Sequence, residues 1–126
     1  MGEITLTLKE ADELFPALDE LANIVIPASA SYRIGKIHRK LKVEISDFLD
    51  LRLDAIKRLG VKHKEKEEWS VLPKNMDEYT TEIDKLLAEE IILSGVMKIE
   101  FDDIRNIQIK PASIAMLELL INGLEE

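Results

Sequence analysis

The chain has 126 residues and no cysteine, and 46% of its residues are hydrophobic and 33% charged. This composition is typical of one folded domain, it excludes disulfides and thiolate metal sites, and no apolar run approaches the roughly 20 residues that a transmembrane helix needs. The net charge of −8 comes from the second half, because residues 65–126 contain six Lys and Arg against fifteen Asp and Glu, and this acidity disfavours general binding to nucleic-acid phosphates.

The first residues predict a strand that leads into a helix. Ile4, Leu6 and Leu8 alternate with threonines, which is the pattern of a strand with one apolar face. Thr7 and Glu10 have the spacing of a capping box, so we expect a helix to begin directly after the strand. Apolar residues continue at helical spacing up to residue 25. Pro16 lies inside this pattern and is expected to kink the helix or to split it in two.

Residues 31–59 predict one long helix, around which the remaining segments are organised. Gly60 follows at the position of a left-handed C-terminal cap. Apolar residues recur three and four positions apart and form one stripe: Ile34, Ile37, Leu41, Ile45, Phe48, Ala55, Ile56 and Leu59.

Arg52 interrupts that stripe at a position where an aliphatic side chain is expected. One interpretation is a structural arginine whose stem packs on its neighbours and whose guanidinium pairs with a carboxylate, and Glu90 is the candidate partner. The other interpretation is an arginine that binds a ligand in a cleft.

A second helix is predicted after the charged stretch 62–68. Asn75, followed three residues later by Glu78, marks its start, and its apolar face extends to a C-terminal end between Leu93 and Gly95. We expect this helix to pack antiparallel against the long one. The connection of about fifteen residues is long for a helical bundle, so we expect it to have structure of its own.

The last segment predicts a β-hairpin and a final helix. Met97, Ile99 and Phe101 alternate with charged residues and indicate a strand, which residues 107–109 would join across a turn at residues 102–103. Pro111 would open the closing helix, whose apolar face would contain Ile114, Leu117, Leu120, Ile121 and Leu124.

These elements together predict a helix-rich α+β fold in one domain covering residues 1–126. We expect a strand and a kinked helix in residues 1–27, a long helical hairpin in residues 28–95, and a β segment followed by a helix in residues 96–126. The small sheet or hairpin is expected at one end of the helical pair.

The residues offer little for catalysis. There are only two histidines, His38 and His63, neither has the flanking pattern of a catalytic motif, and no glycine-rich phosphate loop is present. Glu100, Asp102 and Asp103 form an acidic cluster that we expect to be solvated rather than metal-bound. We therefore predict a protein that is not an enzyme, with no catalytic residues, no metal and no cofactor.

The one local signal for binding is basic. Arg33, Lys36, Arg39 and Lys40 lie within ten residues that contain no acid, and a helix would bring them to one side. They form either a face that is solvated or paired within the chain, or a docking patch for an acidic protein surface or for nucleic-acid phosphates.

Several segments resemble a type of small uncharacterised bacteriophage and prophage protein. They are residues 28–42 (ASASYRIGKIHRKLK), Glu68–Trp69, residues 75–79 (NMDEY) and residues 86–90 (LLAEE), so that the resemblance covers about residues 28–100. It implies a phage-encoded accessory or virion-associated protein in the cytoplasm of a host cell or in the virion. It implies no catalytic residues.

Our preferred hypothesis is a phage-encoded, non-enzymatic protein–protein interaction module that is virion-associated or assists assembly, with no membrane contact. Val43, Leu51 and Leu53 exceed what one apolar seam requires, so self-association is a further hypothesis. One alternative is an inhibitor that places its acidic surface on a host nucleic-acid enzyme or defence complex. A second alternative is nucleic-acid binding through the basic patch between Arg33 and Lys42.

Overall fold

The computed structural model describes residues 2–24, 26–63, 65, 68–105 and 111–122, and its fold is the helix-rich α+β fold that the sequence predicts. In chain order the elements are β1 (Glu3–Thr7), α1 (Leu8–Ala22), α2 (Ala28–Leu59), β2 (Gly60–Lys62), β3 (Trp69–Val71), the 3-10 helix η1 (Pro73–Asn75), α3 (Met76–Leu87), β4 (Glu90–Ser94), β5 (Ile99–Glu100), α4 (Phe101–Ile104), α5 (Pro111–Met116), the 3-10 helix η2 (Glu118–Leu120) and β6 (Ile121–Asn122).

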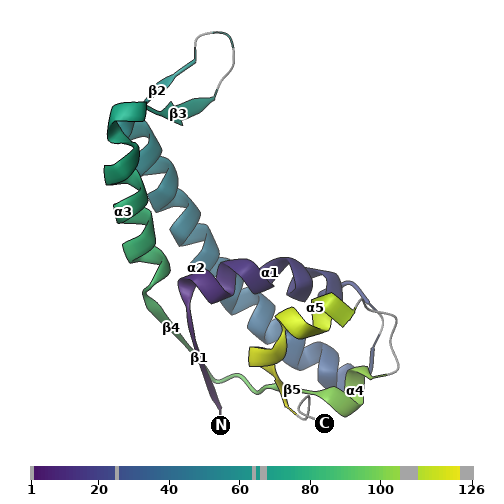
Figure 1. Ribbon diagram of the computed structural model, residues 1–126. Coiled ribbons are helices and arrows are strands. Elements are labelled where there is room, and N and C mark those ends of the chain that lie inside the picture. The colour runs from purple at the N-terminus through teal and green to yellow at the C-terminus, as the bar shows by residue number, and fades with distance from the viewer. Residues whose placement is uncertain (1, 25, 64, 66–67, 106–110, 123–126) are drawn as a thin grey trace.

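Figure 1 shows that these elements form two parts, which we name the body and the arm. The body contains the N-terminal half of α2 with β1, α1 and β4 and the elements that follow β4. The arm consists of residues 44–59 of α2 together with β2, β3 and α3, and it projects from the body with β2 and β3 at its far end. Helix α2 therefore joins the two parts.

Helix α2 confirms the predicted long helix and begins three residues earlier than expected, directly after Pro27. Its 32 residues correspond to a length of about 48 Å at 1.5 Å per residue. The predicted apolar stripe is buried except at Ile56, which is half-buried. The buried residues include Ile34, Ile37, Leu41, Ile45, Phe48, Ala55 and Leu59.

The end of α2 differs from the predicted left-handed cap. Gly60 has φ −132° and ψ −169°, which is extended backbone, and it begins β2 instead of capping the helix. Glycine is required there for lack of space: a Cβ at this position would lie 2.1 Å from the carbonyl oxygen of Ser70 and 2.6 Å from that of Ile56. The chain turns from helix to hairpin at a point where backbones touch.

We therefore expect Gly60→Ala to lower the free energy of unfolding by about 2–3 kcal/mol, because backbone atoms would have to move. Gly35→Ala is the matched control. A Cβ there would meet only the end of the flexible Arg39 side chain at 3.2 Å, and alanine favours a helix interior by about 0.5–1 kcal/mol over glycine. Urea unfolding of both variants tests this, and equal effects would contradict the close approach at Gly60.

Helix α1 begins with the predicted capping box. The Thr7 amide donates to Glu10 Oε1 at 2.8 Å, and the Glu10 amide donates to Thr7 Oγ1 at 3.1 Å. Pro16 does not split the helix, which continues through it to Ala22, three residues short of the predicted end. The buried face of α1 packs on α2 and forms part of the main core of the body.

The second predicted helix is correct at its start and wrong at its end. Helix α3 stops at Leu87, and residues 90–94 form strand β4 instead of a last helical turn. The strand pairs antiparallel with β1, from Thr7 opposite Glu90 to Glu3 opposite Ser94. The two strands bury alternate residues, namely Ile4, Leu6, Ile91 and Leu93. Helices α2 and α3 lie side by side and antiparallel, as predicted.

The connection between α2 and α3 has the structure that its length suggested. Strands β2 and β3 pair antiparallel, with Gly60 opposite Val71 and Lys62 opposite Trp69. The Asn75 side chain donates to the carbonyl oxygen of Leu59 at 2.9 Å, which fixes the start of α3 against the end of α2. The hairpin is thus a defined end of the arm.

The C-terminal segment differs most from the prediction. Strand β5 covers only Ile99–Glu100, and Phe101 and the aspartates after it belong to α4 instead of a turn. The predicted partner strand 107–109 lies outside the described residues. Strand β5 instead pairs in parallel with β6, with Ile99 opposite Ile121, so the predicted final helix ends at Met116 and Ile121 is a strand residue.

Candidate functional site

The structure divides the predicted basic patch into two pairs. Arg33 Nη1 donates to the carbonyl oxygen of Lys98 at 3.1 Å and lies 3.8 Å from Glu100 Oε1. Lys36 Nζ donates to the carbonyl oxygen of Gly95 at 3.0 Å. These two cations therefore hold the segment between β4 and β5 against the start of α2, which is an intramolecular role.

Arg39 and Lys40 are exposed, and neither forms an ion pair with any other described residue. A surface hollow lies next to them on the outer side of α2. Its lining is Arg39, Lys42, Val43, Ser46 and Asp47. This hollow is mixed in charge, whereas the sequence analysis considered only its basic members.

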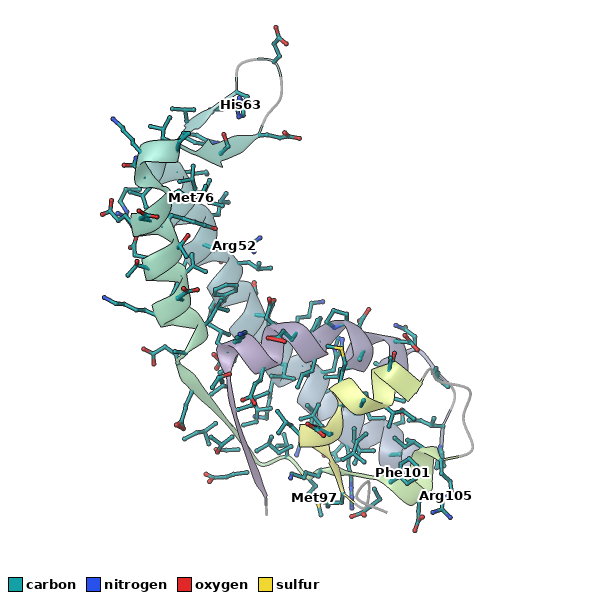
Figure 2. The ribbon with its side chains drawn as sticks, in the orientation of Figure 1. Arg52, His63, Met76, Met97, Phe101 and Arg105 are labelled. Carbon is teal, nitrogen blue, oxygen red and sulfur yellow. The ribbon has the colours of Figure 1, made fainter. Side chains whose placement is uncertain are left out.

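The predicted ion pair between Arg52 and Glu90 does not occur among the described residues. Arg52 lies midway along the arm (Figure 2), where it is exposed and its guanidinium carbon lies 6.0 Å from the centroid of the Phe48 ring. Glu90 is an exposed residue of β4, opposite Thr7. The pairing fails because residue 90 belongs to a strand of the body and not to a helix beside Arg52.

Both histidines contact side chains within the chain. His38 Nε2 lies 3.0 Å from Asp19 Oδ1, and the His38 ring lies 4.9 Å from that of Phe15, so this histidine ties α2 to α1. His63, at the end of the arm (Figure 2), lies 2.7 Å through Nε2 from Ser70 Oγ across the hairpin. Both His63 and Ser70 are exposed, and no described carboxylate bonds to His63 to orient it.

The acidic residues of the C-terminal segment contact different partners instead of forming one cluster. Asp102 pairs with Arg105 three residues later at 3.0 Å, and Glu100 faces Arg33 and Asn122. Across the part of the chain that the structure describes, no three His, Asp or Glu side chains come close enough together to hold a metal ion.

The arm has an ion pair that links its two helices. Arg58 Nη2 donates to both carboxylate oxygens of Glu82, at 2.5 and 2.6 Å, and this hydrogen bond raises the pKa of Arg58 above its usual value. The pair is well exposed, so its contribution to stability is small. Its geometric effect is to fix α3 against the end of α2.

A groove of about 340 Å³ lies beside this ion pair, between α2 and α3. Apolar side chains line it, namely Leu51, Ala55, Ile83 and Leu86, and Asp54, Arg58, Glu82, Lys85 and Glu89 surround them. The sequence pattern indicates that Leu51 is surplus to the core but does not indicate the groove. Only the packing of α3 against α2 brings residues 51–58 and 82–89 together.

The arm also exposes apolar side chains outside the core. Leu49, Leu51 and Leu53 are 42%, 50% and 44% exposed, and Val61 and Met76 are exposed near its end. Figure 2 shows Met76 close to the hairpin. Apolar residues at these positions contribute little to the fold, and five of the ten exposed large hydrophobic residues among those described lie on the arm.

None of the described helices combines the length and the apolar composition that crossing a membrane requires. Comparison with protein-family models, with curated proteins and with solved structures gives no match to this chain.

Proposed function

We propose that this chain is a non-enzymatic protein–protein interaction module whose arm docks on a partner protein. In line with the resemblance noted in residues 28–100, we propose that it is encoded by a bacteriophage and acts in the virion or in its assembly. The observation that carries this proposal is the apolar groove between α2 and α3, beside which Leu51 is 50% exposed.

The energetic argument concerns burial. Covering a leucine side chain completely contributes about 1.5–3 kcal/mol, and roughly half of that is available for side chains that are already partly covered. A partner side chain that fills the groove would cover Leu51 together with the partly buried Leu86, and this gain matters for binding, since tenfold in affinity corresponds to about 1.4 kcal/mol.

The groove beside Leu51 supplies specificity. An apolar floor surrounded by charged groups favours an apolar side chain at the centre of a partner segment and polar groups around it. Arg58 and Glu82 already satisfy each other, so a partner need not neutralise them. The packing of α3 against α2 forms the groove before any partner binds, and preformed sites lose less conformational entropy on binding.

The alternative of nucleic-acid binding has less support. Arg33 and Lys36 are engaged with the segment 95–100, and Asp47 shares the surface hollow with Arg39. We expect no salt-sensitive binding to single-stranded or duplex nucleic acid at low ionic strength, as measured by fluorescence anisotropy. An inhibitor of a host enzyme would also fail to bind nucleic acid, so only the identity of the partner protein distinguishes it from a virion or assembly protein.

The direct test places a photo-crosslinking amino acid at position 51 and, as a matched control, at position 92. Ile92 is 58% exposed, apolar and located on β4 of the body. In a lysate of phage-infected bacteria, the proposal predicts that position 51 attaches a defined virion or assembly protein that position 92 does not. A nuclease or polymerase would favour the inhibitor alternative, and no attachment specific to position 51 would contradict docking by the arm.

A further inference from the structure

The exposed side of α2 has an ordered distribution of charge. A stripe of residues spaced alternately four and three apart lies on one face of the helix: Lys36, Lys40, Val43, Asp47, Asp50 and Asp54. The residues on the N-terminal side of Val43 are basic, and those on its C-terminal side are acidic. Val43 is 61% exposed, and the surface hollow that it lines lies at the centre of the stripe.

The charges of this stripe are largely unused within the chain. Lys36 donates to the carbonyl oxygen of Gly95. Lys40, Asp47, Asp50 and Asp54 are exposed, and none of them forms an ion pair with another described residue. Arg39, beside the stripe, is likewise exposed and forms no ion pair with another described residue. A continuous surface with separated charges of both signs is thus left open.

We propose that a second copy of this chain packs antiparallel along this face, with the two-fold axis at Val43. In that arrangement residue n of one copy lies level with residue 86 − n of the other. Lys36 then lies level with Asp50 of the second copy, and the two Val43 side chains meet. Lys40 lies level with residue 46 of the second copy, one position from its Asp47. Symmetry makes each of these charge contacts occur twice.

The charge pattern also favours an antiparallel copy over a parallel copy and over a nucleic acid. A parallel arrangement would place lysine against lysine and aspartate against aspartate, and such like-charge contacts are unfavourable. A phosphate backbone lying along the stripe would meet Asp47, Asp50 and Asp54. Of these three arrangements, the antiparallel copy is the one that satisfies both halves of the stripe. This surface shares only Asp54 with the groove beside Leu51 and is centred on Val43, eight residues away, so the inference goes beyond the function proposed above.

The first test uses single cysteines, since the chain has none. Val43→Cys places the two thiols at the axis, where an intermolecular disulfide can form. Asp50→Cys places them about 21 Å apart along the helices at 1.5 Å per residue, beyond the roughly 7 Å between Cα atoms that a disulfide spans. Mild oxidation of the pure chain should therefore link Val43→Cys, should not link Asp50→Cys, and should link a mixture of Lys36→Cys with Asp50→Cys.

A parallel contact would instead link Asp50→Cys as readily as Val43→Cys, and random collision would link all exposed cysteines equally. Val61→Cys, at the end of the arm, measures that collision rate because Val61 is exposed and lies far from the proposed axis. Either pattern would overturn the proposal.

The second test reverses charges and measures self-association by sedimentation equilibrium. Lys40→Glu should weaken the association at least tenfold, because it places a glutamate beside Asp47 of the second copy twice. Adding Asp47→Lys should restore it, whereas Lys9→Glu, an exposed reversal on α1, should have no comparable effect. High salt should weaken the wild-type association.

A wild-type chain that stays monomeric at high concentration and low salt would overturn the inference, as would a double variant no better than Lys40→Glu. Both tests use the pure chain, so their failure would leave the crosslinking result at position 51 unaffected. In turn, absence of a partner for the arm would not change the outcome of the cysteine experiment.

Discussion

Replacing Ile91 with aspartate is expected to lower the free energy of unfolding by about 4 kcal/mol or more. Ile91 is 6% exposed and lies on the buried face of β4, opposite Leu6 of β1. A carboxylate there would have to lose its hydration or accept a proton, and none of the buried residues that the structure describes is polar or charged. Because domains of this size are stable by about 5–15 kcal/mol, the variant should unfold at low urea concentration or fail to fold.

The neighbouring residue is the matched control. Ile92 is 58% exposed, so Ile92→Asp should change stability by less than about 0.5 kcal/mol in the same urea titration. Leu93→Asp tests whether residues 90–94 are a strand or a helical turn, since only a strand buries residues 91 and 93 together. It should therefore destabilise the fold as Ile91→Asp does. Tolerance of Leu93→Asp beside intolerance of Ile91→Asp would contradict the pairing of β1 with β4.

Leu41→Ala is expected to destabilise the fold by about 3–5 kcal/mol. Leu41 is completely buried near the middle of α2, and removing most of its side chain leaves a cavity that the surrounding core cannot fully close. Val43→Ala, two residues away on the exposed side of the same helix, should change stability by less than about 0.5 kcal/mol. Urea unfolding at low chain concentration measures both, and comparable losses would contradict the orientation of α2.

Local patterns in the sequence were sufficient to predict the elements that local interactions determine. The capping box at Thr7 and Glu10 fixes the start of α1 through hydrogen bonds between residues three apart. The stripe of α2 repeats over about seven turns at 3.6 residues per turn, so its period is unambiguous. Helix α3 begins directly after Asn75 as predicted, although the Asn75 side chain bonds to Leu59 at the end of α2 instead of capping α3.

The elements that were predicted incorrectly depend on contacts distant in sequence. Residues 90–94 contain too short an apolar run to separate a strand from a helical turn by period. Their partner β1 decides the outcome, and it lies more than eighty residues away. Likewise, Ile121 has helical spacing from Leu117, but pairing with Ile99 makes it a strand residue.

The same reasoning applies to the candidate sites. The sequence places Arg33 and Lys36 in a basic patch with Arg39 and Lys40. The structure separates these two from the patch, because their acceptors are the carbonyl oxygens of residues 98 and 95, which no side-chain pattern reveals. Arg52 was correctly recognised as an interruption of the stripe. Its exposure shows that the covering of α2 is incomplete there, so no buried charge needs Glu90 as a partner.

Both the docking arm and the antiparallel contact require that α2 is one uninterrupted helix from body to arm. Spin labels on Ser31→Cys and Lys57→Cys in one chain, diluted in unlabelled protein, measure this directly by pulsed electron–electron double resonance. Their separation of 26 positions along one helix predicts one narrow distance distribution near 39 Å at about 1.5 Å per residue. A broad distribution, or one centred below about 30 Å, would show a helix broken between body and arm and would contradict the account.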